Sequence, residues 1–253
     1  MDSVPPPAIL RILTWNLNGL EPTLLDERTE AQCLAMLLRD DAPHVVMLQE
    51  VVARTWHAHL KHHFAAAGFV PVPADPHLAT EHDYFCVLLV HRSLPIARSG
   101  AELFPNSFMG RHLVWAEATW GERTVLLATS HLESTKSAGQ ARVAQLAAVV
   151  EGLVNHPGPA VFGGDTNLRK AEEPEVAGLE RVADAWVDIG EPAEQRATWP
   201  SVPRDGRPGA RFDRVYVHDA EVVGFRLLGT TAPGFPRPPS DHLAVEVLVA
   251  PAP

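Results

Sequence analysis

The sequence is poor in cysteine, in lysine and in long apolar runs. Its 253 residues include two cysteines, Cys33 and Cys86, one in a helical pattern and one in a strand pattern. Both lie in apolar surroundings, so buried free thiols are expected rather than a disulfide. This cysteine usage favours an intracellular, cytoplasmic location.

No apolar run is long enough to cross a bilayer, and Arg11 interrupts the first one. Residues 1–7 contain no basic segment of the kind that opens a signal peptide. We expect a loose, Pro-rich leader over residues 1–8 and one domain over residues 9–250. The protein is expected to be a monomer with no membrane partner.

Lysine occurs three times, and the net charge is −10. This charge argues against a protein that coats nucleic acid by electrostatics alone. It does not exclude an enzyme that acts on a phosphodiester end, because carboxylates around a divalent metal make such a site acidic. The other basic residues are arginines, which suit bidentate phosphate contacts.

Apolar periodicity predicts strands and helices in two similar halves without a linker. Helices are expected over residues 26–41, 53–67 and 137–155, with a helical or mixed segment over 172–190. Strands are expected over residues 8–15, 44–49, 69–72, 84–91, 96–104, 113–120, 123–131, 161–165, 212–217, 221–228 and 243–249. Short turns between the middle strands favour antiparallel pairing. Because each sheet must bury one face, the pattern predicts a four-layer α/β/β/α sandwich of two packed mixed β-sheets flanked by helices. Residues 199–210 should form an exposed loop.

The second predicted helix is rich in histidine. His59 and His63 are four residues apart, a spacing that allows two imidazoles to share a metal ion. The sequence places no third ligand beside them. A solvated helix face is therefore the simpler interpretation.

The stretch Val-Phe-Gly-Gly-Asp-Thr-Asn-Leu-Arg at residues 161–169 organises the chain. It has the pattern of a buried strand whose end carries Asp165 and Asn167 into a cleft. Asp can take a proton from water, and Asn can hold that water or a phosphate oxygen without adding charge. Taken alone, the motif is equally compatible with an Asx turn.

Several polar residues share this position beside a predicted strand: Asn16, Glu50, His131, Asp165, Asn167, Asp241 and His242. Polar residues at strand ends converge on one rim of a sandwich. Three carboxylates there would repel one another unless a cation neutralised them, and Mg²⁺ prefers such hard oxygen ligands. The histidines are too dispersed for a zinc site. The set suits phosphoryl chemistry, with Asp165 activating water, Asn167 orienting it, and both imidazoles donating hydrogen bonds to developing charge.

Four motifs resemble the signatures of the endonuclease/exonuclease/phosphatase superfamily: Thr14-Trp15-Asn16, Leu48-Gln49-Glu50, Gly164-Asp165-Thr166-Asn167 and Ser240-Asp241-His242. Their order and spacing agree over nearly the whole chain. Within that superfamily the sequence is most similar to the 5′-tyrosyl-DNA phosphodiesterases, through the stretches 129–135, 163–169, 198–199 and 211–214.

The resemblance implies a role for each motif residue. Glu50 corresponds to the main metal ligand, with Asp241 close by and Asn16 supporting the site. Asp165 and Asn167 correspond to the water-activating pair. The implied cofactor is Mg²⁺, with Mn²⁺ able to substitute.

The resemblance also implies residues that bind the substrate. His242, His131 and Ser134 correspond to groups that hold the scissile phosphate. The path of the 5′ end and of the leaving tyrosine would be lined by Arg169 and Trp199, with Arg111 and Tyr84 as further cleft positions. Two alternatives stay open: the Trp199 ring folding back onto the core, and Arg169 pairing with a site carboxylate.

Three positions depart from the family pattern. Asn18 and Pro200 stand where an Asp is typical, and Lys170 stands where the family often has an acid. The departures leave the catalytic motifs intact and bear on polymer preference.

The implied function is hydrolysis of a 5′-phosphotyrosyl bond at a DNA end, releasing a 5′-phosphate in DNA repair. The implied partners are DNA 5′ ends bearing a tyrosyl or peptide adduct. A phenol, with a pKa of about 10, leaves more readily than a sugar alkoxide. The alternatives are a general Mg²⁺-dependent endo- or exonuclease or a small-molecule phosphoesterase on the same fold. A non-catalytic binding module predicts a broken metal site, whereas every motif residue is present.

Overall fold

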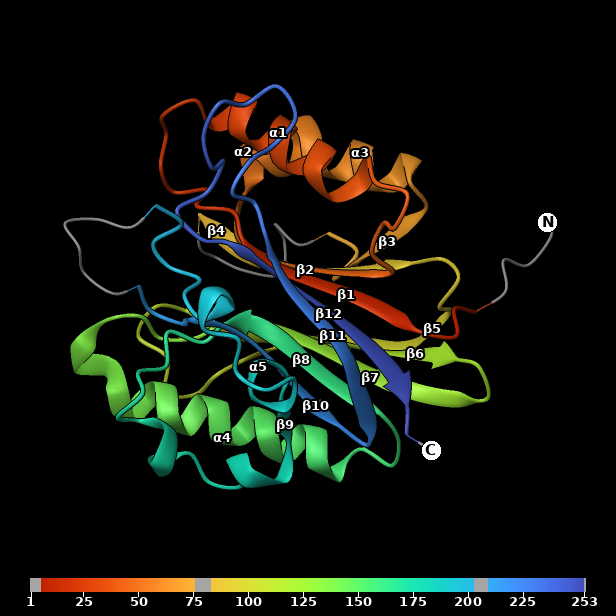
Figure 1. Cartoon of the computed structure of the whole chain (residues 1–253), viewed down its shortest axis with the longest axis vertical. Helices are drawn as coiled ribbons and strands as arrows, with labels where there is room; N and C mark the ends of the chain where they lie inside the picture. The colour runs from red at the N-terminus through yellow and green to blue at the C-terminus, as the bar shows by residue number, and fades with distance from the viewer. Residues whose placement is uncertain (1–5, 76–82, 203–208, 253) are drawn as a thin grey trace.

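Two six-stranded sheets pack face to face, with helices on both outer faces (Figure 1). The computed structural model describes residues 6–75, 83–202 and 209–252. The four-layer sandwich predicted from the sequence is confirmed. Within the described ranges no helix has the length and apolarity needed to span a membrane.

The first sheet has the strand order β11-β12-β1-β2-β4-β3. Its strands are β1 (Leu10–Asn16), β2 (Val45–Val52), β3 (Phe69–Val72), β4 (Tyr84–His91), β11 (Ala220–Leu228) and β12 (Ala244–Pro251). β1 and β2 run parallel, and the register places Asn16 opposite Gln49. Asn16 and Glu50 therefore reach the same edge of the sheet.

The second sheet has the strand order β5-β6-β7-β8-β10-β9. Its strands are β5 (Ile96–Leu103), β6 (His112–Trp120), β7 (Arg123–His131), β8 (Ala160–Asp165), β9 (Ala183–Asp184) and β10 (Asp213–His218). β7 and β8 run parallel with His131 opposite Asp165, and antiparallel β10 places Asp213 opposite Asp165 as well. Three polar side chains thus start from adjacent backbone positions.

The two sheets are not formed by two consecutive halves of the chain. The middle strands belong to the second sheet, and the chain then returns so that β11 and β12 extend the first one. In Figure 1 the blue C-terminal strands lie beside the red β1. The return matters because it brings the segment before β12, with Asp241 and His242, next to the end of β1.

Helices cover both outer faces. α1 (Leu25–Leu37), α2 (Ala53–Thr55), the π-helical turn η1 (Trp56–Leu60) and α3 (Lys61–Ala66) lie over the first sheet, and α4 (Gly139–Asn155) lies over the second. The first helix ends before the predicted residue 41, because Leu38 leaves the helical region with φ −86° and ψ 58°. The third predicted helix agrees closely with α4 and the preceding 3₁₀ turn η3 (Lys136–Ala138).

The segment over residues 172–190 is mixed rather than one helix. It contains the 3₁₀ turns η4 (Glu173–Glu175) and η5 (Leu179–Arg181), then β9 and the short α5 (Ala185–Asp188). Gly178 adopts a φ of +75° and interrupts any continuous helix. A further 3₁₀ turn, η6 (Ala193–Gln195), follows.

The core between the sheets is aliphatic, as the alternating strand pattern requires. Val45, Met47, Val161, Val215 and Val247 are among its fully buried members. Separate apolar clusters lie beneath α1 to α3 and beneath α4. Each sheet is therefore buried on both faces, which leaves the strand ends as places for polar chemistry.

Cys33 and Cys86 are free and buried, as predicted. Burial raises the pKa of both thiols to about 12, so they remain protonated and unreactive at neutral pH.

The close approach of β7 and β8 yields a prediction about stability. A β-carbon on Gly164 would overlap the carbonyl oxygen of Ser130. Gly164→Ala should therefore destabilise the protein by about 1–3 kcal/mol through overpacking, measured by urea unfolding. The control is Gly152→Ala in α4, where a β-carbon meets no atom within 4 Å. Ala there should stabilise by about 0.5–1 kcal/mol. Equal unfolding midpoints for Gly164→Ala and the parent chain would contradict this strand spacing.

Candidate active site

A cleft of about 520 Å³ lies at the edge of the sandwich where the central strands of both sheets end. Its lining residues are Leu20, Glu50, Tyr84, Met109, Arg111, His131, Ser134, Asp165, Asn167, Arg169, Trp199, Phe212, Asp241 and His242. Every site residue predicted from the sequence lines this cleft except Asn16. Asn16 lies just beneath it and hydrogen-bonds two of the lining carboxylates.

Asn16 connects the two sheets at the floor of the cleft. Its Nδ2 donates to Glu50 Oε1 at 3.2 Å and to Asp165 Oδ2 at 3.0 Å, while its Oδ1 accepts from the Asn18 backbone N–H at 2.9 Å. The Ser240 hydroxyl donates to the Asn16 carbonyl and so ties the segment before β12 to β1. The amide holds two carboxylates in place without adding charge of its own.

Glu50 lies at an irregularity in β2. The pairing with β4 shifts register between Leu48 and Val51, and Glu50 has a φ of +51°. Such a bulge redirects a side chain, and a non-glycine residue in this region is typical of functional sites. Burial, with a smaller contribution from Asp241, raises the pKa of Glu50 in spite of the Asn16 hydrogen bond. A partly desolvated carboxylate with an acidic neighbour is an environment that a bound divalent cation would stabilise.

Asp165 is held from several sides. Its Oδ1 accepts from the Asn167 backbone N–H at 3.0 Å, and its Oδ2 lies 3.3 Å from His131 Nε2. Burial raises the pKa of Asp165 to about 6, although the charge of His242 opposes the shift. Burial also holds the pKa of His131 well below its usual value, and the charges of Arg111 and His242 act in the same direction. His131 is therefore neutral at pH 7.

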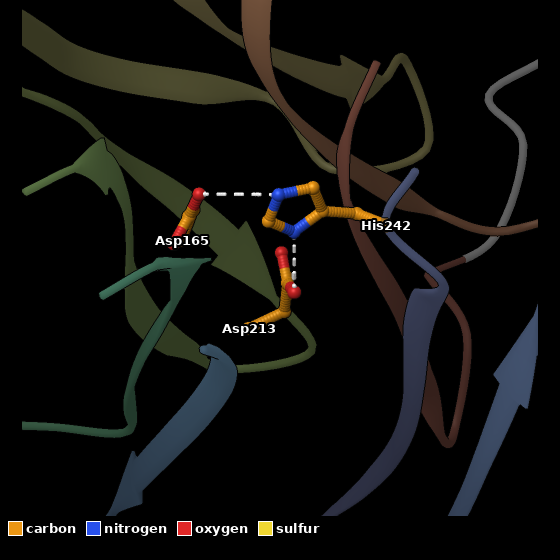
Figure 2. A group of neighbouring side chains, drawn as sticks. All are labelled: Asp165, Asp213 and His242. Atoms are coloured by element: carbon orange, nitrogen blue, oxygen red, sulfur yellow. Dashed lines mark hydrogen bonds and ion pairs between the residues drawn. The ribbon is translucent and has the colours of Figure 1, made fainter. Parts of the chain in front are cut away.

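Asp213 was not predicted as a site residue, yet it makes the shortest contact to His242. Figure 2 shows the His242 ring between the two aspartates, with Nδ1 2.8 Å from Asp213 Oδ2 and Nε2 3.8 Å from Asp165 Oδ2. Burial by itself would lower the pKa of His242, but Asp213 and Asp165 outweigh it and raise the pKa to about 10. The sequence did contain one sign of this role, because Asp213 is an acidic residue at the start of a predicted apolar strand, directly after Phe212.

Asp165, Asp213 and His242 lie close enough together to form a possible metal site, with one ligand atom from each within 4.8 Å of the others. Chemistry favours a different interpretation. An imidazolium has no lone pair to give to a metal, and both nitrogens of His242 face carboxylates. We interpret these three residues as a hydrogen-bonded and ion-paired group.

One wall of the cleft combines a cation with aromatic rings. Arg169 donates to the backbone carbonyls of Ser134 at 3.1 Å and Asn167 at 3.3 Å, and its guanidinium lies 6.0 Å from the centre of the Phe212 ring. Its ion pair is with Glu172 at 3.9 Å, outside the cleft, so the predicted alternative of a site carboxylate partner is not observed.

Trp199 both packs against the protein and lines the cleft, so the predicted cleft position and the alternative of a ring that folds back are both observed in part. Its ring packs 5.6 Å from Phe212 and 6.5 Å from His242, and its Nε1 donates to Asp241 Oδ2 at 3.0 Å. The residue is nevertheless 36% exposed and lines the cleft. It begins the expected 199–210 loop, of which residues 203–208 lie outside the described ranges.

The opposite wall is formed by Arg111, whose guanidinium lies 5.3 Å from the centre of the Tyr84 ring. Buried Glu133 positions the preceding loop, because its Oε1 accepts from the Ser107 hydroxyl and from the backbone N–H groups of Phe108 and Met109. The loop is thereby fixed by a charge-assisted network rather than by secondary structure.

The fold and the cleft define the class of the protein. The Endonuclease/Exonuclease/phosphatase family matches residues 13–242, and the chain belongs to this family. The resemblance of the four motifs is thereby confirmed. This family is metal-dependent.

The proteins that are similar in sequence to this chain include tyrosyl-DNA phosphodiesterases. The chain is 31% identical over 246 residues to tyrosyl-DNA phosphodiesterase 2 of Xenopus laevis, covering 91% of this chain and 63% of the relative. It is 30% identical over 250 residues to the Homo sapiens protein, covering 93% and 66%. The chain thus spans just under two thirds of the length of these relatives.

Solved structures of TDP2 proteins have a similar fold. D. rerio TDP2 complexed with single strand DNA product superimposes with a TM-score of 0.84 at 29% identity, covering 96% of this chain and 99% of that one. TDP2 from C. elegans superimposes with a TM-score of 0.81 at 27% identity, covering 96% and 75%.

The pairing of His242 with Asp213 yields a prediction about pH. In the metal-free protein, His242 should titrate near pH 10 in imidazole NMR spectra. Because its folded-state pKa is raised, its charge stabilises the fold fully below about pH 6.5, and this contribution is lost as the pH rises through 10. Asp213→Asn should lower the pKa of His242 by removing the nearest carboxylate charge. Asp219→Asn on the surface should leave it unchanged. An unaltered His242 titration in Asp213→Asn would show that the ion pair is not formed.

Proposed function

We propose that the protein is a metal-dependent phosphodiesterase that hydrolyses a 5′-phosphotyrosyl bond at a DNA end and leaves a 5′-phosphate. The observation that carries the proposal is the arrangement of Asp165 between Asn167, Asn16 and His242 in a cleft whose other side holds Glu50. The likeness to tyrosyl-DNA phosphodiesterases and to a structure holding a DNA product supports the choice of substrate.

Mg²⁺ is the proposed ion, with Mn²⁺ able to substitute. Glu50 would be its main ligand, with Asp241 close by and Asn16 supporting the site through its amide bond to Glu50. Carboxylate oxygens of this kind suit a hard cation. When bound, the ion supplies positive charge to a phosphate oxygen and to the leaving oxygen.

Asp165 is proposed to accept a proton from the attacking water. Its pKa of about 6 suits a general base that must be ionised near neutral pH and still hold a proton transiently. Asn167 is proposed to orient the water. The Asn167 backbone N–H donates to Asp165 Oδ1 at 3.0 Å, and the Asn167 Nδ2 donates to the Leu132 carbonyl at 3.4 Å, so both side chains are held in place.

The scissile phosphate is proposed to lie against His242, His131 and Ser134. His242 is charged at neutral pH and donates to the developing negative charge, while neutral His131 offers one N–H. A tyrosine phenol, with a pKa of about 10, leaves as phenolate without a dedicated general acid.

The DNA strand is proposed to follow the wall formed by Arg169, Phe212 and Trp199, with Arg111 and Tyr84 facing it. Aromatic faces accept stacked bases without regard to sequence, and the guanidinium groups provide charge for phosphates. A general nuclease or a small-molecule phosphoesterase remains the alternative. DNA 5′ ends carrying a tyrosyl or peptide adduct are the proposed partners.

The decisive experiment measures tyrosine release from a 5′-phosphotyrosyl oligonucleotide in the presence of Mg²⁺. We expect release that a chelator abolishes and that Mn²⁺ restores. An abasic duplex, a plain 5′-phosphate strand and a simple aryl phosphodiester should be assayed in parallel. Cleavage of the abasic duplex or the aryl diester alone would retire the tyrosyl assignment and leave the alternative.

Two variants control this experiment. Glu50→Gln and Asp165→Asn should each reduce the rate by at least about a hundredfold, because each removes a charge from the reacting centre. Circular dichroism should show that both remain folded. The matched control is Glu122→Gln in the exposed turn between β6 and β7. If both site variants kept full activity, Glu50 and Asp165 would not take part in the reaction, and the proposed active site would be wrong.

The exposed ring of Trp199 yields a prediction about specificity. Trp199→Ala should raise KM for the oligonucleotide by roughly 5- to 150-fold, since stacking on a base contributes about 1–3 kcal/mol. Turnover of a small aryl phosphodiester, which has no base to stack, should change far less. Trp199→Phe should recover most of the affinity. An equal loss on both substrates would instead indicate that the ring acts by positioning Asp241.

A further inference from the structure

Three consecutive backbone carbonyls beside the cleft accept hydrogen bonds from two arginines. Arg142 on α4, which is fully buried, donates through Nη1 to the carbonyls of Glu133 at 2.6 Å and Thr135 at 3.1 Å. Arg169 donates through Nη2 to the carbonyl between them, that of Ser134, at 3.1 Å. The two arginines therefore hold the segment that follows β7 and contributes Ser134 to the cleft.

Glu172 joins these two arginines. Its carboxylate accepts from Arg142 Nη2 at 2.6 Å and from Arg142 Nε at 3.0 Å, which is a bidentate pair. Its Oε2 also accepts from the Arg169 backbone N–H at 2.9 Å, and the Glu172 N–H donates to the Arg169 carbonyl at 2.8 Å. Two bonds thereby close the turn over residues 169–172, and Arg142 fastens that turn to α4.

The Glu172 carboxylate is shared unequally between the two guanidinium groups. Arg142 Nη2 lies 2.6 Å from Glu172 Oε1, whereas Arg169 Nη1 lies 3.9 Å from the same oxygen. Burial by itself would raise the pKa of Glu172, but hydrogen bonds from Arg142 and from the Arg169 backbone lower it, so the carboxylate is charged at neutral pH. Two guanidinium groups and one carboxylate leave one positive charge, and the distances locate it at Arg169.

The Arg169 guanidinium is the part of this group that a substrate can reach. The Arg169 side chain is 32% exposed and lines the cleft, whereas the lining does not include Glu172 or Arg142. An arginine that is free to move loses rotamer freedom when it binds, and this loss opposes binding. Because the backbone and the guanidinium of Arg169 are both held in advance, less freedom remains to be lost.

We propose that Glu172 and Arg142 are positioning residues that present the Arg169 guanidinium to a phosphate of the bound strand. Arg142 neutralises the Glu172 carboxylate, so Glu172 orients Arg169 without cancelling its charge. The inference rests on the proposed function for the identity of the strand. It gives a role in substrate binding to two residues outside the cleft.

Binding of a single-stranded 5′-phosphate oligonucleotide, followed by fluorescence anisotropy, tests the inference. A chelator in the buffer prevents turnover by a metal-dependent enzyme. Glu172→Gln should weaken binding by on the order of tenfold, because Arg169 is no longer held toward the strand. Loss of a negative charge without loss of positioning would instead strengthen binding to a polyanion. The matched control is Glu175→Gln, which removes the same charge from an exposed position in η4 and should not weaken binding.

The salt dependence of binding separates positioning from a general structural effect. Arg169→Met should reduce the slope of log affinity against log salt by about 0.7, the value for one phosphate contact on a single strand. Glu172→Gln should reduce it by a similar amount, and in the Arg169→Met background it should weaken binding no further. If the two losses multiplied in the double variant, Glu172 would act independently of Arg169 and the inference would be wrong.

Circular dichroism must show that Glu172→Gln is folded, because the substitution leaves buried Arg142 without its anion. If it unfolds, Gly139→Ala replaces it, since a β-carbon there would lie 2.9 Å from Glu172 Oε1 and displace the carboxylate with every charge kept. Binding should then weaken by roughly threefold or more, whereas Gly152→Ala on the same helix should leave it unchanged. Affinity equal to that of the parent chain, in the folded variant that is used, would overturn the inference.

This experiment can fail separately from the test of the proposed function. A parent chain that binds the strand but releases no tyrosine with Mg²⁺ would overturn the proposed function alone. Tyrosine release together with unchanged binding by folded Glu172→Gln would overturn the positioning role alone.

Discussion

The Asn16 amide is the interaction on which the cleft depends, because one NH₂ group joins carboxylates from both sheets. Glu50 belongs to the first sheet and Asp165 to the second, and Asn16 Nδ2 donates to both. A charged residue in this place would pair with one carboxylate and leave an uncompensated charge. The amide satisfies both and keeps its oxygen for the Asn18 backbone. The two carboxylates at the rim of the sheets are thus held together by a neutral group.

The negative charges in and behind the cleft are only partly compensated by positive ones. The cleft gathers Glu50, Asp165 and Asp241, and buried Asp213 lies directly behind. His242 compensates part of this charge, since its neighbours keep it protonated. Burial leaves Glu50 with a raised pKa and only a neutral hydrogen-bond donor. The remaining negative charge is therefore located at Glu50, which is the ligand proposed for the divalent cation.

The sequence predicted the site residues that follow directly after an apolar strand. It did not predict a site residue whose position depends on how two distant strands pair. Asn16, Glu50 and Asp165 follow apolar strands. The apolar pattern of these strands and the need of each sheet to bury one face predicted that the three residues would lie at the same edge of the sandwich. Asp213 was missed because its role depends on the register of β10 against β8, which no local pattern encodes.

Net charge constrains what the cleft can recognise. At −10 the molecule repels a long polyanion, so its affinity cannot come from charge along a duplex. The two arginines that line the cleft, Arg111 and Arg169, are each associated with an aromatic ring. Under the proposed function, these two arginines and Trp199 would contact one or two nucleotides beside the phosphate that is cleaved. Under the proposed function, the protein recognises the 5′ end of a DNA strand rather than a long stretch of duplex.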